Sequence, residues 1–161
     1  MTTTSRPRSA SRRAPAPIAG LLLVGSVLLA GCGEPSREEL AAQVDEVCVE
    51  EAAAFEELAE RASAESTDVA AQLESGAAIR EEALDALREL DPSDDLQEPF
   101  DDYLALREEN LEITRAAVDA AERGDREALD VATATLADRT AETDLTASQL
   151  GADECVSSPA E

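Results

Sequence analysis

Apolar side chains recur along residues 36–150 at intervals of three or four positions. This spacing places them on one face of an α-helix, because the helix has about 3.6 residues per turn. The pattern predicts four amphipathic helices with these apolar positions: Leu40, Val44, Val47, Cys48, Phe55, Leu58 and Ala62; Val69, Leu73, Ala77, Ile79, Ala83, Leu87 and Leu90; Phe100, Leu104, Leu111, Thr114, Val118 and Ala121; and Leu129, Ala132, Leu136, Thr143, Ala147 and Leu150. Such sustained periodicity favours ordered helices over the disorder that is typical of strongly acidic chains.

Local signals mark where the first two helices begin and end. Residues Ser36–Glu39 have the pattern of a capping box, in which serine and glutamate satisfy backbone N–H groups at a helix start. We expect the first helix to run from there to about Ala64. The turn-forming residues 66–68 open the second helix, which we expect to continue to Asp91, because Pro92 cannot continue a helix.

Proline and glycine delimit the third and fourth helices. The third is expected to open near residues 93–94, and Pro99 marks either its true start or a kink. Residues 123–125, Arg-Gly-Asp, end the third helix with a glycine and begin the fourth with an aspartate cap, and Gly151 ends the fourth. Since short connections make consecutive helices antiparallel, the sequence predicts an all-α, up-down-up-down four-helix bundle.

The composition supports helices and excludes several kinds of chemistry. Apolar residues are 43% of the chain and aromatic residues only 2%, which suits closely packed helices and argues against a β-sandwich or barrel. Histidine, lysine and tryptophan are absent. Their absence excludes histidine catalysis, histidine metal ligands and Schiff-base lysines. The formal charge of −24 argues against a nucleic-acid partner.

The first 31 residues have the order of a secretory signal peptide. A basic stretch without acidic residues precedes an apolar run over Ile18–Ala30, and residues 29–32 read Leu-Ala-Gly-Cys. This tetrapeptide resembles a bacterial lipobox, which implies cleavage before Cys32 and a lipid on its sulfur. Ordinary signal-peptidase cleavage and an uncleaved anchor are the alternatives. Arg12-Arg13 is a partial match to a twin-arginine export signal.

These features predict the organisation of the whole chain. We expect a lipoprotein signal peptide at 1–31, a short tether at 32–35 with lipidated Cys32, the four-helix bundle at 36–155 and a disordered tail at 156–161. The protein is then exported and anchored to the outer face of the cytoplasmic membrane. Membrane attachment through the lipid overcomes the repulsion between an acidic protein and anionic headgroups.

The cysteine count agrees with lipidation. If Cys32 is lipidated, Cys48 and Cys155 remain as a pair in an oxidising compartment, where a disulfide is expected. Two buried free thiols are the alternative. Cys48 lies twelve residues after Ser36, whereas the tail after Gly151 is short. We therefore expect the first turns of the first helix to project from the bundle as a stalk.

Local patterns across residues 40–155 carry a resemblance to other proteins. They are Val47-Cys48-Val49, Ala86-Leu87-Arg88-Glu89-Leu90-Asp91-Pro92, Phe100 with Tyr103-Leu104, Ala120-Ala121-Glu122-Arg123-Gly124-Asp125, and Leu150-Gly151 before Cys155. In this order they resemble a group of small secreted proteins and lipoproteins of high-GC bacteria that have no established activity. The resemblance implies a helical bundle with a disulfide between the first helix and the tail. It transfers no catalytic residue.

Candidate chemistry is sparse. Adjacent carboxylates are frequent, but neighbours on a helix point in different directions and are expected to form a solvated surface. Residues 91–95 lack the glycine and the terminal glutamate of a calcium loop. We expect no catalytic residue, no metal site and no cofactor. Tyr103, Arg107 and Asn110 share one helix face and could line a groove between helices; the alternative is the edge of the core.

Two functions follow from these observations. The first is a non-enzymatic, lipid-anchored helical module for interaction or scaffolding in the cell envelope, with an envelope protein as partner. The second is a lipoprotein that binds a small molecule or cation and serves a transporter or sensor. The second function requires a cavity between the helices.

Overall fold

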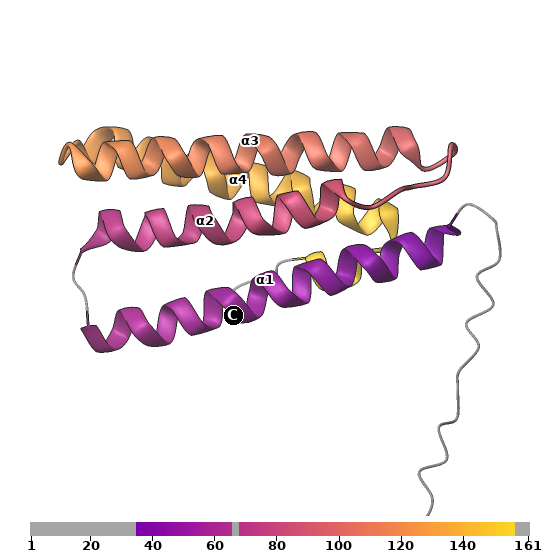
Figure 1. Ribbon diagram of the computed structural model, residues 1–161. Coiled ribbons are helices and arrows are strands. Elements are labelled where there is room, and N and C mark those ends of the chain that lie inside the picture. The colour runs from indigo at the N-terminus through magenta and orange to yellow at the C-terminus, as the bar shows by residue number, and fades with distance from the viewer. Residues whose placement is uncertain (1–34, 66–67, 157–161) are drawn as a thin grey trace, which may run out of the picture. The chain divides into compact units, whose positions relative to one another are not determined.

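The computed structural model describes residues 35–65 and 68–156, with the side chains of 63–65 left out. The chain divides into two units after Cys32, and every described residue belongs to the second unit. The described residues form four helices, α1 (Arg37–Glu65), α2 (Val69–Arg88), α3 (Gln97–Glu122) and α4 (Arg126–Leu150), followed by the 3₁₀ turn η1 (Asp153–Cys155) (Figure 1). The described residues include no strand. The predictions for the signal peptide, for Cys32 and for residues 157–161 lie outside the described part.

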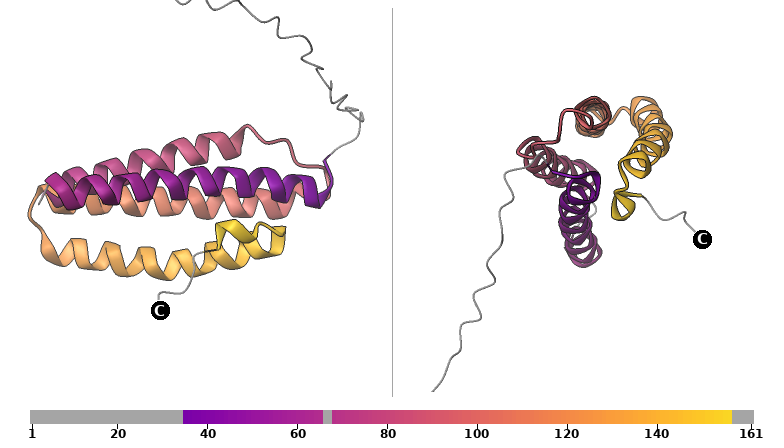
Figure 2. Two further views of the ribbon diagram at one scale, coloured as in Figure 1. Left: turned by 90° about the horizontal axis from the view of Figure 1, so that it is seen from below. Right: turned by 90° about the vertical axis from the view of Figure 1, so that its right-hand side faces the viewer.

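Consecutive helices lie side by side and run in opposite directions (Figure 1). Helix α2 packs against both α1 and α3, and α3 also packs against α4. Contact between α1 and α4 is slight, and η1 lies between these two helices (Figure 2). The described residues therefore form an all-α four-helix bundle whose last seam is filled in part by the tail.

Local sequence signals account for most helix ends. The Ser36 N–H donates to Glu39 Oε2 over 2.8 Å, and the Glu39 N–H donates to Ser36 Oγ over 3.3 Å, so the capping box is confirmed. These hydrogen bonds with Ser36 hold the pKa of Glu39 below its usual value. The side chains of Asp68 and Asp125 cap α2 and α4. Gly151, with φ at 89°, ends α4 in the left-handed conformation that glycine adopts without strain.

Two predicted boundaries differ from the structure. Helix α2 ends at Arg88 and not at Asp91, because Pro92 disfavours the helical conformation at the residue before it and the last turn tightens. Helix α3 begins at Gln97, ahead of Pro99. Pro99 lies in the first turn, where its missing N–H leaves no intrahelical bond unmade.

The core has a large and a small cluster. The large cluster is at the end of the bundle where α1 begins and consists of Leu40, Val44, Leu87, Leu96, Phe100, Tyr103, Ala147, Leu150 and Ala152. The small cluster consists of Ala77, Leu84 and Leu111. Leu104 packs against both clusters. The two aromatic residues of the large cluster are fully buried, so they supply much of its volume.

The predicted stalk is wrong. Leu40 is 1% exposed and packs within the large cluster, and the Arg37 guanidinium donates to the Gln149 carbonyl over 2.8 Å. The first turns of α1 are therefore part of the bundle. The short tail still reaches Cys48, because the left-handed Gly151 lies beside Ala41 and the chain then follows α1. The Glu154 N–H marks this path by donating to Asp45 Oδ1 over 2.9 Å.

Candidate functional site

A groove of about 390 Å³ lies along the seam between α1 and α4. Side chains from all four helices and from the tail surround it; they are Cys48, Glu51, Ala52, Phe55, Arg80, Arg107, Asn110, Leu136, Thr140, Thr143, Asp144, Glu154, Cys155 and Val156. The groove exists because α1 and α4 barely touch. Its volume is in the range of pockets that hold a small molecule.

An ion pair between α1 and α3 forms part of the wall. Arg107 Nη2 donates to Glu51 Oε2 over 2.5 Å, and the two side chains are only 14% and 11% exposed. Burial lowers the pKa of the Arg107 guanidinium, but Tyr103 and Glu51 together outweigh it and raise that pKa above its usual value. Arg107 therefore stays charged, and its charge is balanced within the protein.

Arg80 of α2 is in a different situation. Its guanidinium carbon lies 4.9 Å from the centre of the Phe55 ring, and Arg80 makes no ion pair within residues 35–62 and 68–156. Gly76 lies beside the same ring, since a Cβ at that position would be 3.4 Å from Phe55 Cε1. Burial lowers the pKa of Arg80, and Arg107 lowers it further, while Glu51 raises it. Its half-buried charge thus has no carboxylate of its own.

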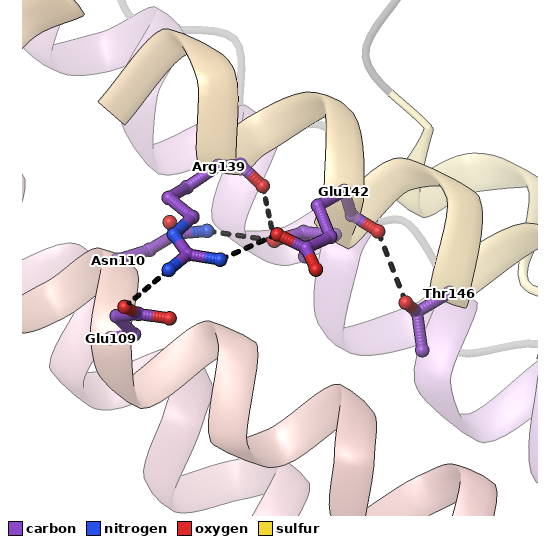
Figure 3. Close-up of polar contacts among 6 residues, drawn as sticks. Glu109, Asn110, Arg139, Glu142 and Thr146 are labelled. Atoms are coloured by element: carbon purple, nitrogen blue, oxygen red, sulfur yellow. Dashed lines mark hydrogen bonds and ion pairs between the residues drawn. The ribbon is translucent and has the colours of Figure 1, made fainter. Parts of the chain in front are cut away.

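Asn110 is the most unusual polar group of the groove. It is 8% exposed, and its Nδ2 donates to Thr143 Oγ1 over 2.9 Å. Thr143 Oγ1 in turn donates to the Arg139 carbonyl over 2.9 Å, which fixes the hydroxyl as the acceptor for Asn110. Figure 3 shows Asn110 beside Arg139, whose guanidinium binds Glu109 and Glu142. Asn110 Oδ1 is buried and accepts no hydrogen bond from any described residue.

The Cys48–Cys155 disulfide closes one end of the groove. The two sulfur atoms are 2.03 Å apart. The Tyr103 oxygen lies 3.6 Å from Cys48 Sγ, and because a disulfide sulfur carries no hydrogen, the hydroxyl is the donor. Burial raises the pKa of Tyr103, so its hydroxyl keeps its proton. The tail that carries Cys155 is fixed to α1 and forms the wall at this end.

The structure brings the predicted groove residues together only in part. Arg107 and Asn110 line the groove, whereas Tyr103 is fully buried beneath it in the large cluster. Sequence reasoning missed Glu51 and Arg80. Glu51 lies three residues after Cys48, and Arg80 lies three residues after Ala77, so each lies on the apolar face of its predicted helix. A charged residue on an apolar helix face is the signal that could have indicated them.

The described residues show neither a cluster of metal ligands nor a helix able to span a membrane. No three or more cysteine or acidic side chains of residues 35–62 and 68–156 are grouped so that they could hold a metal ion. None of the described helices has the length and apolar character needed to cross a membrane. Comparison with family models, curated proteins and solved structures finds no match for this chain. The resemblance to small secreted proteins and lipoproteins of high-GC bacteria stays a prediction.

Proposed function

We propose that this chain is an exported protein, anchored through a lipid on Cys32 at the outer face of the cytoplasmic membrane, that binds a small molecule in the α1–α4 groove. The observation that carries the proposal is Asn110, which lines the groove and whose buried Oδ1 accepts no hydrogen bond from any described residue. Leaving such a group unpaired costs about 1–3 kcal/mol. A ligand N–H or O–H that donates a hydrogen bond to this oxygen would remove that cost. Ligand binding in the groove would therefore be favourable at Asn110.

Binding fits the chemistry of the groove better than catalysis. Its two cysteines are joined in a disulfide, so neither offers a thiolate nucleophile. Arg107 is neutralised by Glu51, and the whole chain lacks histidine. The groove therefore offers groups that hold and orient a molecule but no activated base or nucleophile.

The alternative of a scaffolding module has less support. Val131 and Leu145 of α4 are exposed, and Val131 lines a second hollow between α3 and α4 with Ile113 and Ala128. Single exposed apolar side chains are common on protein surfaces and do not define an interface. The envelope-interaction hypothesis stays a prediction without a surface assigned to it.

The anchoring part of the proposal predicts a definite mature N-terminus. Intact-mass spectrometry of the protein from the membrane fraction is expected to show loss of residues 1–31 and addition of a diacylglyceryl group to Cys32. The control variant Cys32→Ser should keep its leader and carry no lipid. Membrane-bound protein with an intact leader and an unmodified Cys32 would contradict the anchoring proposal.

The binding part predicts an unusual effect of Asn110→Leu on stability. The substitution removes the unpaired acceptor and one hydrogen bond, while Thr143 keeps its bond to the Arg139 carbonyl. We expect the free energy of unfolding to rise by about 1 kcal/mol, since replacing an unsatisfied buried polar group by an apolar one of similar size is favourable. Urea unfolding measures this change.

The matched control for Asn110→Leu is Thr143→Val, which leaves both polar ends of Asn110 unpaired. It is expected to lower the free energy of unfolding by about 1–2 kcal/mol. A screen of small molecules by thermal shift should find a ligand for the natural protein that fails to stabilise Asn110→Leu. If Asn110→Leu is strongly destabilised, the amide has a structural role and the proposal loses its main support.

A further inference from the structure

The charge of Arg80 needs a partner that the described residues do not supply. Among the described arginines, Arg88, Arg107, Arg115 and Arg139 each form an ion pair with at least one carboxylate. Four arginines that form no ion pair among the described residues are exposed to water, namely Arg37, Arg61, Arg123 and Arg126. Arg80 instead lies half-buried against Phe55 in the groove. The Glu51 carboxylate raises the pKa of Arg80 but is already bound to Arg107. A cation in this position attracts an anion that enters the groove.

The contact with Phe55 leaves the guanidinium able to bind such an anion. Stacking on an aromatic ring uses the flat face of the guanidinium, whereas its N–H groups lie in the plane and point outward from the edge. A planar edge with two parallel N–H groups matches a carboxylate, which accepts both bonds at once. The Arg80 guanidinium carbon lies 4.9 Å from the centre of the Phe55 ring, and its N–H groups form no ion pair with residues 35–62 and 68–156, so they can bind a carboxylate.

We propose that the ligand of the groove is a small organic acid with one carboxylate and an apolar body, and that its carboxylate binds the Arg80 guanidinium. This inference rests on the proposed function and assigns the chemical class of the ligand. Phe55, Ala52 and Leu136 offer apolar surface to the body of the ligand. Asn110 Oδ1 accepts a hydrogen bond from a hydroxyl or N–H that the body carries.

The charges around Arg80 favour one carboxylate over a phosphate group. Glu51, Asp144 and Glu154 also line the groove, and the whole chain carries a formal charge of −24. A doubly charged phosphate meets about twice the repulsion of a monocarboxylate from this field, while Arg80 supplies a single unpaired positive charge. The groove thus favours a singly charged acid over a doubly charged one, and the surrounding carboxylates would tolerate an amine on the ligand.

The test uses pairs of probes that differ only in charge. Titration calorimetry of the purified full chain measures the affinities of 4-methylpentanoate, phenylacetate, indole-3-acetate and L-leucine, each against its primary amide, with inorganic phosphate as the dianion. We expect at least one acid to bind at least tenfold more tightly than its amide, and phosphate to bind more weakly than that acid.

Four variants separate a role in binding from a role in folding. Arg80→Gln should reduce the affinity for the acid to that for its amide, and Arg80→Lys should retain part of it, since the charge remains without the planar edge. Arg88→Gln, an exposed arginine on the same helix, is the matched control and should leave the affinity unchanged. Glu154→Gln removes a carboxylate beside the groove and should strengthen acid binding by about two- to threefold, a gain that unfolding cannot produce.

The outcomes distinguish this inference from the function on which it rests. Equal affinity for acid and amide, or unchanged acid affinity in Arg80→Gln, overturns the organic acid as ligand. If a neutral or cationic molecule binds instead and Asn110→Leu abolishes its binding, the proposed function stands and the ligand class is wrong. If neither these probes nor a screen of small molecules gives a ligand, both proposals are overturned.

Discussion

Loss of the Cys48–Cys155 disulfide is expected to lower the free energy of unfolding by about 4–5 kcal/mol. The bridge joins residues 107 positions apart and so closes nearly the whole bundle into one loop. Cross-linking a loop of this length removes much of the conformational entropy of the unfolded chain. A loss of this size is a large fraction of the stability of an ordinary domain, which is about 5–15 kcal/mol.

Urea unfolding of the double variant Cys48→Ala/Cys155→Ala against the oxidised natural protein measures the loss. The matched control is the natural protein under reducing conditions, whose free energy of unfolding should agree with that of the double variant to within about 1 kcal/mol. If the oxidised protein and the double variant differ by less than about 1 kcal/mol, the disulfide does not hold the bundle together in the way described.

The disulfide matters because, among the described residues, the seam between α1 and α4 is otherwise held only near the start of α1, by the large cluster and the hydrogen bond from Arg37 to the Gln149 carbonyl. Helices α1 and α4 make slight contact, and the tail between them is attached to α1 by the disulfide and by the Glu154–Asp45 hydrogen bond. The same lack of contact creates the groove. A cross-link at one end therefore allows the seam to stay open along the rest of its length. A stable fold and an open groove are thus compatible in a small domain.

The sequence predicts the helices well because helix formation is decided locally. The Ser36–Glu39 capping box, the Asp125 cap and the left-handed Gly151 each depend on residues within one turn. The end of α2 depends on tertiary packing as well as on Pro92. Leu96, in the connection after α2, is buried in the large cluster, and this connection needs the residues that a longer α2 would have used.

The sequence does not predict the offset of neighbouring helices along the bundle axis or the rotation of each helix about its own axis. The expected stalk assumed that the tail runs straight from Gly151, whereas the chain turns back along α1. Arg107 and Asn110 could be proposed because they share a face of one helix. Arg80 and Glu51 belong to other helices, and their arrival in the same groove depends on the rotation of each helix about its axis, which no pattern within a single segment contains.

Replacement of Phe100 by alanine is expected to lower the free energy of unfolding by about 3–5 kcal/mol. Phe100 is 1% exposed in the first turn of α3, where it packs with Leu40 of α1 and Leu96 of the preceding connection. The core is otherwise built largely from alanine and leucine, and helices held at fixed distances cannot close a cavity the size of a phenyl ring. The substitution therefore removes buried apolar surface and leaves a void.

The matched control for Phe100→Ala is Leu145→Ala, a truncation of an apolar side chain on α4 that is 61% exposed. Its effect on the free energy of unfolding should stay within about 0.5 kcal/mol, because the leucine is already largely in water. Urea unfolding of both variants gives the comparison. A loss below about 1.5 kcal/mol for Phe100→Ala would mean that the end of the bundle where α1 begins is loosely packed.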